Sequence, residues 1–240
     1  LTEESSNFIL KDIHKKYNTQ INDILLTALI LAFNKWQGHN KLLLNLEGHG
    51  REEISEDTDI NRTVGWFTSV YPVMLNVSDP SETGSAIKSV KESLRNIPES
   101  GIGFGLLKFL CDDEEIKKSI SSFSEPEILF NYLGQFNFNT DWKIREDLKL
   151  VQDKSELRFH LIEINAMTVN NRIKFEFSYS NNFHNRESIE RLSGYYSESI
   201  NEIIKHCSDD KTISGYTPSD FSASGLDQNE LDDLMNNLNS

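Results

Sequence analysis

The chain has 240 residues and a formal net charge of −14, so its length suits one large domain or two small ones. Hydrophobic residues make up 37% of the chain and aromatic residues 10%, which is enough to bury a core. The acidic balance argues against nucleic acid as a partner, because phosphate binding requires clustered lysine and arginine.

Membrane insertion and disulfide bonding are also disfavoured. The longest apolar stretch, "ILLTALILAF" at 24–33, is shorter than the roughly 18 residues of a membrane span. Cys111 and Cys207 stand apart without a CxxC spacing, which indicates reduced, structural cysteines in a cytoplasmic protein. The chain opens on Leu1 with no signal-peptide pattern after it. We expect it to be a piece of something longer.

The first third predicts two helices and a strand. Apolar residues at helical spacing predict a helix through residues 2–17, with Thr2 as its N-cap. A second helix, apolar around most of its circumference and therefore buried, is predicted to begin near residues 18–19 and to end at Gly38. The short apolar run at 41–47 suits an interior strand.

A polar loop at 51–62 precedes an aromatic and β-branched stretch at 64–77, which predicts a strand. Pro72 inside that stretch indicates an edge strand, a bulge or a break in the ladder. A helix is then predicted with Asp79 as its cap and Pro80 in its first turn. Three alternate glycines (Gly101, Gly103 and Gly105) predict a flexible loop before a helical stretch at 106–121.

Three further strands are predicted at 127–136, 157–169 and 172–180, with the asparagine pair at 170–171 as a tight hairpin turn. A long helix at 185–206 carries one apolar stripe. The order of elements predicts an α/β or α+β fold, in which flanking helices pack on a mixed sheet.

The composition changes from about Thr212, where lysine and arginine are no longer found. This part of the chain is predicted to be a linker. Its last residues could form a short acidic amphipathic helix through Leu226, Leu231, Leu234 and Leu238. A frayed, solvated terminus is the competing interpretation.

The stretch "NLEGHGREE" at 45–53 is the first candidate site. A metal site there would need further ligands at suitable spacing, and the remaining histidines are scattered. No GxSxG turn supports a nucleophilic triad. On spacing alone, an ion pair of Glu47 with Arg51 and a backbone bond from His49 are favoured. A carboxylate beside glycines also suits an acid or base.

Two other stretches are weaker taken singly. "FNYLGQF" at 130–136 offers Asn131, Tyr132 and Gln135 around Gly134, which usually indicates polar residues at the rim of a core. "PESGIGFG" at 98–105 lacks the GK[ST] ending of a phosphate loop and does not match GxGxxG. A nucleotide site is not favoured.

Taken together in chain order, these stretches resemble the epimerization domains of nonribosomal peptide synthetases. "RTVGWFTSVYP" and "EGHGRE" match the epimerase variants, and a condensation-type DFGW motif is absent. Phe104 departs from the tyrosine that is common in the family. The matching stretches are "NDILLTAL" (22–29), "EGHGRE" (47–52), "NRTVGWFTSVYPVML" (61–75), "PESGIGFG" (98–105), "FNYLGQF" (130–136) and the exit segment "YTPSDFS" (216–222).

The resemblance implies one lobe of a two-lobed fold like that of chloramphenicol acetyltransferase. The family's HHxxxDG motif, which carries an essential histidine in the N-terminal lobe, does not occur here. Residues 1–222 are therefore expected to be the C-terminal lobe, and residues 223–240 an acidic linker or docking helix. Half of the active site, and no independent activity, is expected of this fragment.

The implied reaction is inversion at the α-carbon of an L-aminoacyl or peptidyl thioester, carried on the 4′-phosphopantetheine of a carrier domain. No bound cofactor and no metal are expected. The resemblance makes Glu47 the acid or base, and has Tyr132, with Asn131, steady the enolate or supply a proton. We hypothesise that His49 and Arg51 hold Glu47 and its loop. Residues expected along the substrate tunnel are Trp66, Thr68, Tyr71 and Gln135.

Expected partners are the upstream peptidyl carrier domain, the N-terminal lobe and, through the tail, a downstream condensation domain. No nucleic acid or membrane is expected. Two alternatives remain: a condensation-type acyltransferase lobe, and a non-catalytic module that docks carrier domains or neighbouring modules.

Overall fold

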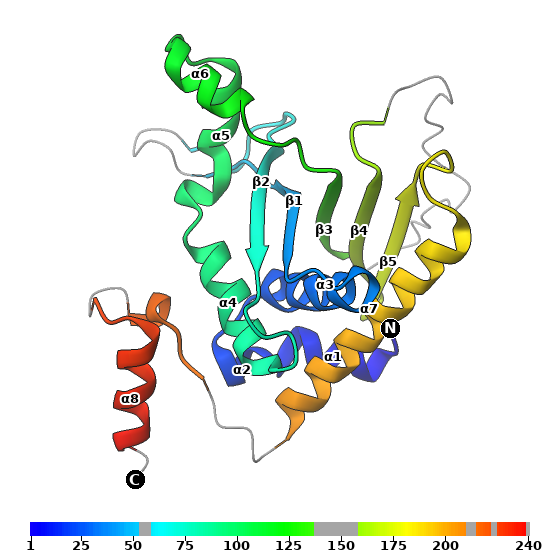
Figure 1. The fold of residues 1–240 in the computed structure, drawn as a ribbon, viewed down its shortest axis with the longest axis vertical. Coiled ribbons are helices and arrows are strands. Elements are labelled where there is room, and N and C mark those ends of the chain that lie inside the picture. The colour runs from blue at the N-terminus through cyan, green and yellow to red at the C-terminus, as the bar shows by residue number, and fades with distance from the viewer. Residues whose placement is uncertain (53–58, 137–157, 210–214, 222–224, 239–240) are drawn as a thin grey trace.

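The computed structural model describes residues 1–52, 59–136, 158–209, 215–221 and 225–238. One mixed sheet of five strands runs in the order β2-β1-β3-β4-β5 (Figure 1). The two outer pairs are antiparallel, and β3 is parallel to both β1 and β4. The strands are β1 (Lys41–Gly48), β2 (Ser69–Asn76), β3 (Ile128–Phe136), β4 (Ile162–Val169) and β5 (Arg172–Tyr179). The predicted mixed sheet is confirmed.

Helices flank this sheet, as predicted. Helices α4 and α5 contact the edge strand β2, and α3 packs against α7. Figure 1 shows α4, α5 and α6 in succession beside β2, with α8 set apart near the C-terminus. The helices are α1 (Glu3–Lys11), α2 (His14–Tyr17), α3 (Ile21–Gln37), α4 (Thr83–Arg95), α5 (Ile102–Phe109), α6 (Glu114–Ser121), α7 (Arg186–Ser208) and α8 (Gln228–Leu238), with 3-10 turns at Pro98–Gly101 and Pro218–Phe221.

The first two helices begin and end close to the predicted positions. Thr2 caps α1, because its hydroxyl accepts a bond from the backbone N–H of Ser5. Gly38 ends α3 in the left-handed conformation, with φ 76°. The single helix predicted through 2–17 is instead divided. The backbone N–H groups of both Asp12 and Ile13 bond to the carbonyl of Phe8, which closes α1.

Two predictions before the third strand are wrong. Asp79 does not cap α4, because Glu82 holds that position. The carboxylate of Asp79 instead accepts bonds from the backbone and hydroxyl of Ser81, and so forms a local turn ahead of the helix. The glycine loop is mostly helical. Gly103 and Gly105 lie inside α5, and only Gly101, with φ 82°, has a left-handed backbone.

The strand predictions hold with later starting points. The strand expected at 64–77 begins at Ser69, and the one expected at 157–169 begins at Ile162. Pro72 lies on the edge strand β2, where its missing N–H costs no ladder bond on the outer side. The asparagine pair forms the predicted hairpin turn between β4 and β5, with φ of 49° and 60°.

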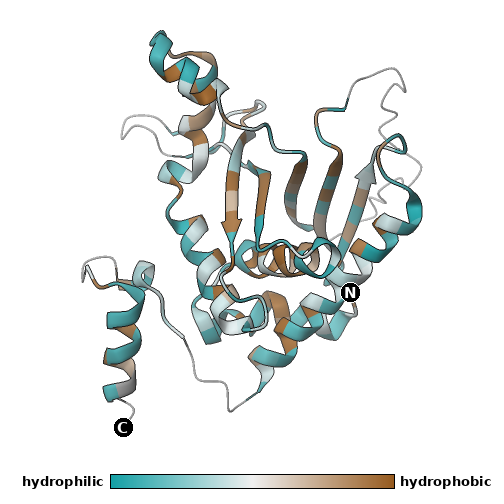
Figure 2. Cartoon of the chain, in the orientation of Figure 1, coloured by the Kyte–Doolittle hydropathy of each residue, from teal (hydrophilic) through white to brown (hydrophobic). Residues whose placement is uncertain are grey.

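The sheet has a buried face and an open face. Buried and half-buried residues alternate along β4, and the buried ones join those of α3 and α7 in one core. Figure 2 shows hydrophobic residues along β1 and β2 and mainly hydrophilic ones on α8. Because successive side chains of a strand point to opposite faces, Asn45 and Glu47 of β1, Asn131 of β3 and Glu163 of β4 share the open face.

The C-terminal segment is attached to the body. The backbone N–H of Gly215 bonds to the carbonyl of Lys16, 2.9 Å away. The predicted tail helix exists as α8, and Leu231 on it is 2% exposed. Lys88 of α4 pairs with Asp232 at 2.9 Å. None of the helices in the described ranges is both long and apolar enough to cross a membrane.

Candidate functional site

The candidate site lies on the open face of the sheet, at the end of β1. Leu44 and Leu46 of this strand are buried in the core, so Asn45 and Glu47 point the other way. Both are half-buried. Glu47 is paired in the sheet register with Val70 of β2, and Asn45 with Pro72. The predicted acid or base therefore stands on the face of the sheet opposite the core that α3 and α7 share with the buried strand residues.

Asn131 of β3 holds the Glu47 side chain. Its amide Nδ2 donates a 2.5 Å hydrogen bond to Oε2 of Glu47. Burial raises the pKa of Glu47, the bond from Asn131 lowers it, and the charge of Glu163 raises it further, so that the net pKa lies above its ordinary value. A carboxyl group with a raised pKa transfers protons more readily near neutral pH than an ordinary surface glutamate does.

Arg51 organises the loop after β1 and does not pair with Glu47. Its guanidinium donates to the carbonyls of Ile60 (2.5 Å) and Thr63 (2.9 Å) and lies 4.3 Å from the centroid of the Phe67 ring. Within the described residues, the side-chain hydrogen bond of Glu47 is the one to Asn131, so the ion pair that spacing alone suggested is not formed.

His49 is an exposed residue of the same loop. Its Nδ1 accepts a bond from the backbone N–H of Arg51 at 3.0 Å, and its Nε2 lies 3.3 Å from a carboxylate oxygen of Glu52. The backbone bond matches the expectation from spacing. These contacts connect His49 to the loop rather than to the Glu47 carboxylate. Its hypothesised part in holding Glu47 stays a prediction.

Gly50 brings two parts of this loop into close approach. Its φ is +64°, and a Cβ placed there would lie 1.5 Å from the carbonyl oxygen of Phe67. No other residue fits that space without moving the backbone. The glycine therefore fixes the loop after Glu47 against the segment that leads into β2.

The "PESG" turn closes the same end of the sheet. A Cβ on Gly101 would lie 2.3 Å from the Tyr71 ring, and one on Gly48 would lie 3.4 Å from it. Tyr71 is thus enclosed between the end of β1 and the turn at Pro98–Gly101. Burial, and then the charge of Glu52, raise its pKa. Tyr71 is paired in register with buried Leu46 and packs against the core, so this expected tunnel residue lies on the face opposite Glu47.

The other expected tunnel residues are more open. Trp66 is 90% exposed, Gln135 is exposed and Thr68 is half-buried. Within the described part of the chain, their side chains form no hydrogen bond with Glu47.

Tyr132 lies on the opposite face from Asn131. Its ring packs against the core, and its hydroxyl is 3.0 Å from the hydroxyl of Thr168, a residue that is 1% exposed. Adjacent residues of a strand point to opposite faces, so Asn131 reaches Glu47 while Tyr132 does not. A β-bulge between Tyr132 and Gln135, at Gly134 with φ 89°, changes the register just beyond. The catalytic role of Tyr132 stays a prediction.

Sequence reasoning missed two contacts of open-face residues, one made by Asn45 and one made by Glu163. The amide Nδ2 of Asn45 donates to Nε2 of His160 at 2.9 Å, and Glu163 pairs with Arg158 at 3.1 Å. Burial, the largest influence, lowers the pKa of His160, which favours a neutral imidazole. The alternation of Ile162 and Ile164 in β4 was the available signal, because it assigns Glu163 to the face of Glu47.

Neither metal binding nor thiol chemistry is indicated in the described ranges. These ranges contain no group of three or more histidine, cysteine, aspartate or glutamate residues arranged to hold a metal ion. Cys111 and Cys207 are free cysteines, half-buried and buried respectively. Burial raises the pKa of Cys207 to about 11, so it is a poor nucleophile.

Comparison with known proteins identifies the family. The family model described as "Condensation domain" matches residues 2–224. The chain belongs to the condensation domain family. Two curated relatives show the similarity in sequence. A subunit of linear gramicidin synthase from Brevibacillus parabrevis is 41% identical over 98% of this chain. A subunit of mycosubtilin synthase from Bacillus subtilis is 39% identical over 98% of it. The chain spans only 3% and 9% of those two relatives.

Solved structures agree on the fold. The epimerization domain from the third module of tyrocidine synthetase B is 36% identical, with a TM-score of 0.79 over 86% of this chain and 47% of that one. The first condensation domain of the CDA synthetase is 12% identical, with a TM-score of 0.55 over 85% of this chain and 43% of that one. At this low identity the comparison shows a shared fold only. The condensation-domain fold is thereby established.

Proposed function

We propose that this condensation-family chain is the C-terminal lobe, residues 1–222, of an epimerization domain. It would invert the α-carbon of an aminoacyl or peptidyl group that a carrier domain presents as a thioester on its phosphopantetheine arm. The observation that carries the proposal is a half-buried carboxyl group with a raised pKa, Glu47, held by Asn131 on the open face of the sheet. The likeness to the tyrocidine epimerization domain supports the same reaction.

The chemistry requires a base, a stabilised enolate and a proton donor on the other face of the planar carbon. A thioester already acidifies its α-hydrogen, so a carboxylate can remove it once desolvation has raised its pKa. In this proposal Glu47 takes or returns the α-proton, and Asn131 orients the carboxylate. The second proton-transfer group would come from the N-terminal lobe, which would cover the open face. The 47% of the tyrocidine domain that the chain matches is consistent with one lobe of two.

The proposed part of Tyr132 can be separated from that of Glu47. Its hydroxyl is bonded to Thr168, so it would have to leave that partner in order to steady an enolate. We therefore expect Tyr132→Phe to slow α-proton exchange less than Glu47→Gln does. Equal losses in the two variants would give Tyr132 a direct chemical role.

The test of the proposed function uses the complete two-lobed domain with its carrier, loaded with an L-aminoacyl thioester in deuterated water. Deuterium should enter the α-position and the D-epimer should accumulate. Glu47→Gln should lower the exchange rate at least ~100-fold, the usual minimum contribution of a general acid or base. Glu176→Gln, an exposed glutamate of β5, is the matched control. Normal exchange in Glu47→Gln would refute the role of Glu47.

A condensation-type acyltransferase is the second candidate, because the matching family model carries that description. Such an enzyme would join two carrier-bound substrates through an amide bond and would leave the α-hydrogen in place. Amide formation without deuterium uptake would favour it. A non-catalytic docking module would do neither and would still bind the carrier domain.

The tail is proposed to reach a partner beyond the domain. Residues 223–240 carry α8, whose Leu231 packs on the body while Leu234 is 47% exposed. An exposed apolar side chain on an acidic helix suits a groove on a downstream condensation domain. Removal of residues 223–240 should lower product transfer between the two synthetases and leave α-proton exchange unchanged. If product transfer between the two synthetases were unchanged, α8 would not bind the downstream condensation domain. A cytoplasmic location remains a prediction.

A further inference from the structure

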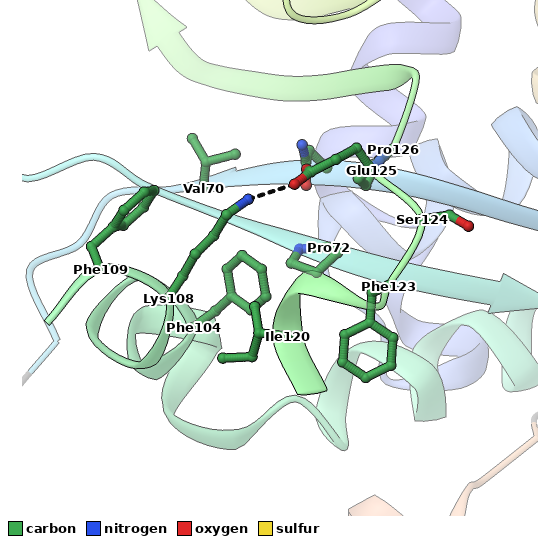
Figure 3. A pocket seen from close by; sticks show the side chains of 11 residues that line it. Val70, Pro72, Phe104, Lys108, Phe109, Ile120, Phe123, Ser124, Glu125 and Pro126 are labelled. Atoms are coloured by element: carbon green, nitrogen blue, oxygen red, sulfur yellow. Dashed lines mark hydrogen bonds and ion pairs between the residues drawn. The ribbon is translucent and has the colours of Figure 1, made fainter. Parts of the chain in front are cut away.

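A cavity of about 130 Å³ lies next to Glu47 on the open face of the sheet. Its floor is formed by Asn45, Val70 and Pro72, and its walls come from α5, α6 and the segment that follows α6 (Figure 3). Val70 is the cross-strand partner of Glu47, and Asn45 lies two residues before Glu47 on the same face. Directly paired residues have Cβ atoms about 4.5–5.5 Å apart, so the cavity begins one side chain away from the carboxylate.

The lining of this cavity is mainly apolar. Three phenylalanine rings, Phe104, Phe109 and Phe123, contribute to it together with Ile120 (Figure 3). Phe109 and Phe123 are 75% and 63% exposed, an unusual degree for such large apolar side chains. Apolar walls with a few polar groups are the usual composition of a small-molecule site.

The charges at the rim neutralise each other. Lys108 pairs with Glu125 at 2.8 Å and lies 5.7 Å from the centre of the Phe104 ring. Neither charge is therefore left to attract an acidic or a basic group. An uncharged, apolar occupant fits this environment, whereas a carboxylate would lose its hydration without gaining an unpaired cation.

We propose that this cavity receives the side chain of the residue whose α-carbon is inverted, and that it selects apolar side chains. The proposal rests on the proposed epimerization and deepens it. When Glu47 faces the α-hydrogen, the side chain is attached to that same carbon and must lie within one residue's width of the carboxylate. The side chain keeps its attachment during inversion, so one cavity serves both epimers. An apolar cavity of about 150 Å³ holds a benzene ring, so the similar volume here suits a leucyl or phenylalanyl side chain.

The experiment uses the complete two-lobed domain and carrier proteins preloaded chemically with L-leucyl, L-phenylalanyl, L-alanyl or L-aspartyl thioesters. Deuterium uptake at the α-carbon is measured for each substrate. The leucyl and phenylalanyl thioesters should exchange at least ~10-fold faster than the aspartyl one, the smaller end of what an apolar pocket discriminates. Equal rates for all four would overturn the proposal.

Two substitutions at exposed positions should change this preference in opposite directions. Val70→Phe, at a residue 41% exposed, narrows the cavity and should lower the ratio of phenylalanyl to alanyl exchange roughly 10-fold. Phe123→Ala widens it and should raise that ratio. Leu107→Ala is the matched control, because Leu107 is 45% exposed on α5 and does not line the cavity. A ratio unchanged in both cavity variants would overturn the proposal.

Binding separates failure of the cavity from failure of the proposed function. Affinities are measured for pantetheine carrying the same four aminoacyl groups through a stable amide. If no substrate exchanges deuterium but Val70→Phe abolishes a preference for the apolar amides, the epimerase function fails and the cavity stands. If exchange occurs with no side-chain preference in rate or affinity, the cavity proposal fails and the epimerase function stands.

Discussion

The ammonium group of Lys91 lies 2.7 Å from both carboxylate oxygens of Asp220, and the two side chains are 1% and 6% exposed. This buried ion pair joins α4 to the 3-10 turn at Pro218–Phe221. Lys91 also donates to the carbonyl of Tyr17 at 2.8 Å, and Asp220 accepts from Asn18 at 2.6 Å. One lysine therefore holds together α2, α4 and the segment that leads out of the domain.

Removal of one member of this pair should be costly. We expect Asp220→Ala to lower the free energy of unfolding by about 3–5 kcal/mol, because Lys91 would remain buried without a counterion. The double variant Lys91→Met with Asp220→Ala should recover much of that loss. Urea unfolding of the complete domain measures both. The exposed pair Lys15–Asp12 is the control, and Asp12→Ala should cost under about 1 kcal/mol.

Acid should weaken the same attachment. Burial acts to raise the pKa of Asp220, but bonds from Lys91, Thr217 and Asn18 and the charge of Lys91 outweigh it, so the pKa lies below its ordinary 3.8. A depressed carboxyl pKa gives stability that is present above the unfolded value and lost as pH falls through the folded value. Unfolding free energy should therefore drop below about pH 4, and Asp220→Asn should lack that part of the drop. Parallel acid profiles for the two proteins would contradict this.

Two glycines should respond in opposite ways to substitution by alanine. Gly50→Ala places a Cβ against the carbonyl of Phe67 at a positive φ, so it should displace the loop after Glu47 and lower both stability and α-proton exchange. Gly103→Ala lies in α5 with nothing within 4 Å of the new Cβ. It should stabilise the domain by about 0.5–1 kcal/mol. Thermal unfolding of the two variants measures the difference, and similar melting temperatures would contradict the opposite effects expected at Gly50 and Gly103.

Asn131 should set the pH dependence of the reaction. Its hydrogen bond lowers the pKa of Glu47 against the raising effect of burial. Asn131→Ala should therefore shift the rising limb of the exchange-rate profile to higher pH. It should also slow exchange about tenfold below that limb, if the bond contributes about 1.5 kcal/mol. Asn165→Ala, on the same face of β4 and paired with Asn131, is the control. If the pH profile of the exchange rate were the same in Asn131→Ala as in the unchanged domain, Asn131 would not set the pKa of Glu47.

Much of the fold was readable from local patterns. The strict alternation of β5 and the asparagine pair before it specify a strand and a two-residue turn, and both are found. Helix α3 was predictable because its apolar positions and Gly38 agree. Asp79 misled because aspartate serves equally as a helix cap and as the start of a tight turn, and only the packing of α4 on β2 selects between them.

The site was only partly readable. The motif pointed to Glu47 and Asn131, and their hydrogen bond brings together residues 84 positions apart in the chain. The alternation of Ile128 and Phe130 in β3 assigns Asn131 to the open face and Tyr132 to the core face, and this signal could have separated the two residues. The cavity could not be predicted, since long-range packing brings its floor from β1 and β2 together with its walls from α5, α6 and the segment after α6.

The alternation along β1 has a practical consequence for redesign. Leu42, Leu44 and Leu46 are buried in the core, and their neighbours Leu43, Asn45 and Glu47 lie on the open face that carries the candidate site. A library that varies only the second set samples new reactivity while the hydrophobic core keeps its composition. Tolerance measured residue by residue along this strand should rise and fall with a period of two when the readout is stability. When the readout is turnover, the maxima and minima should exchange places.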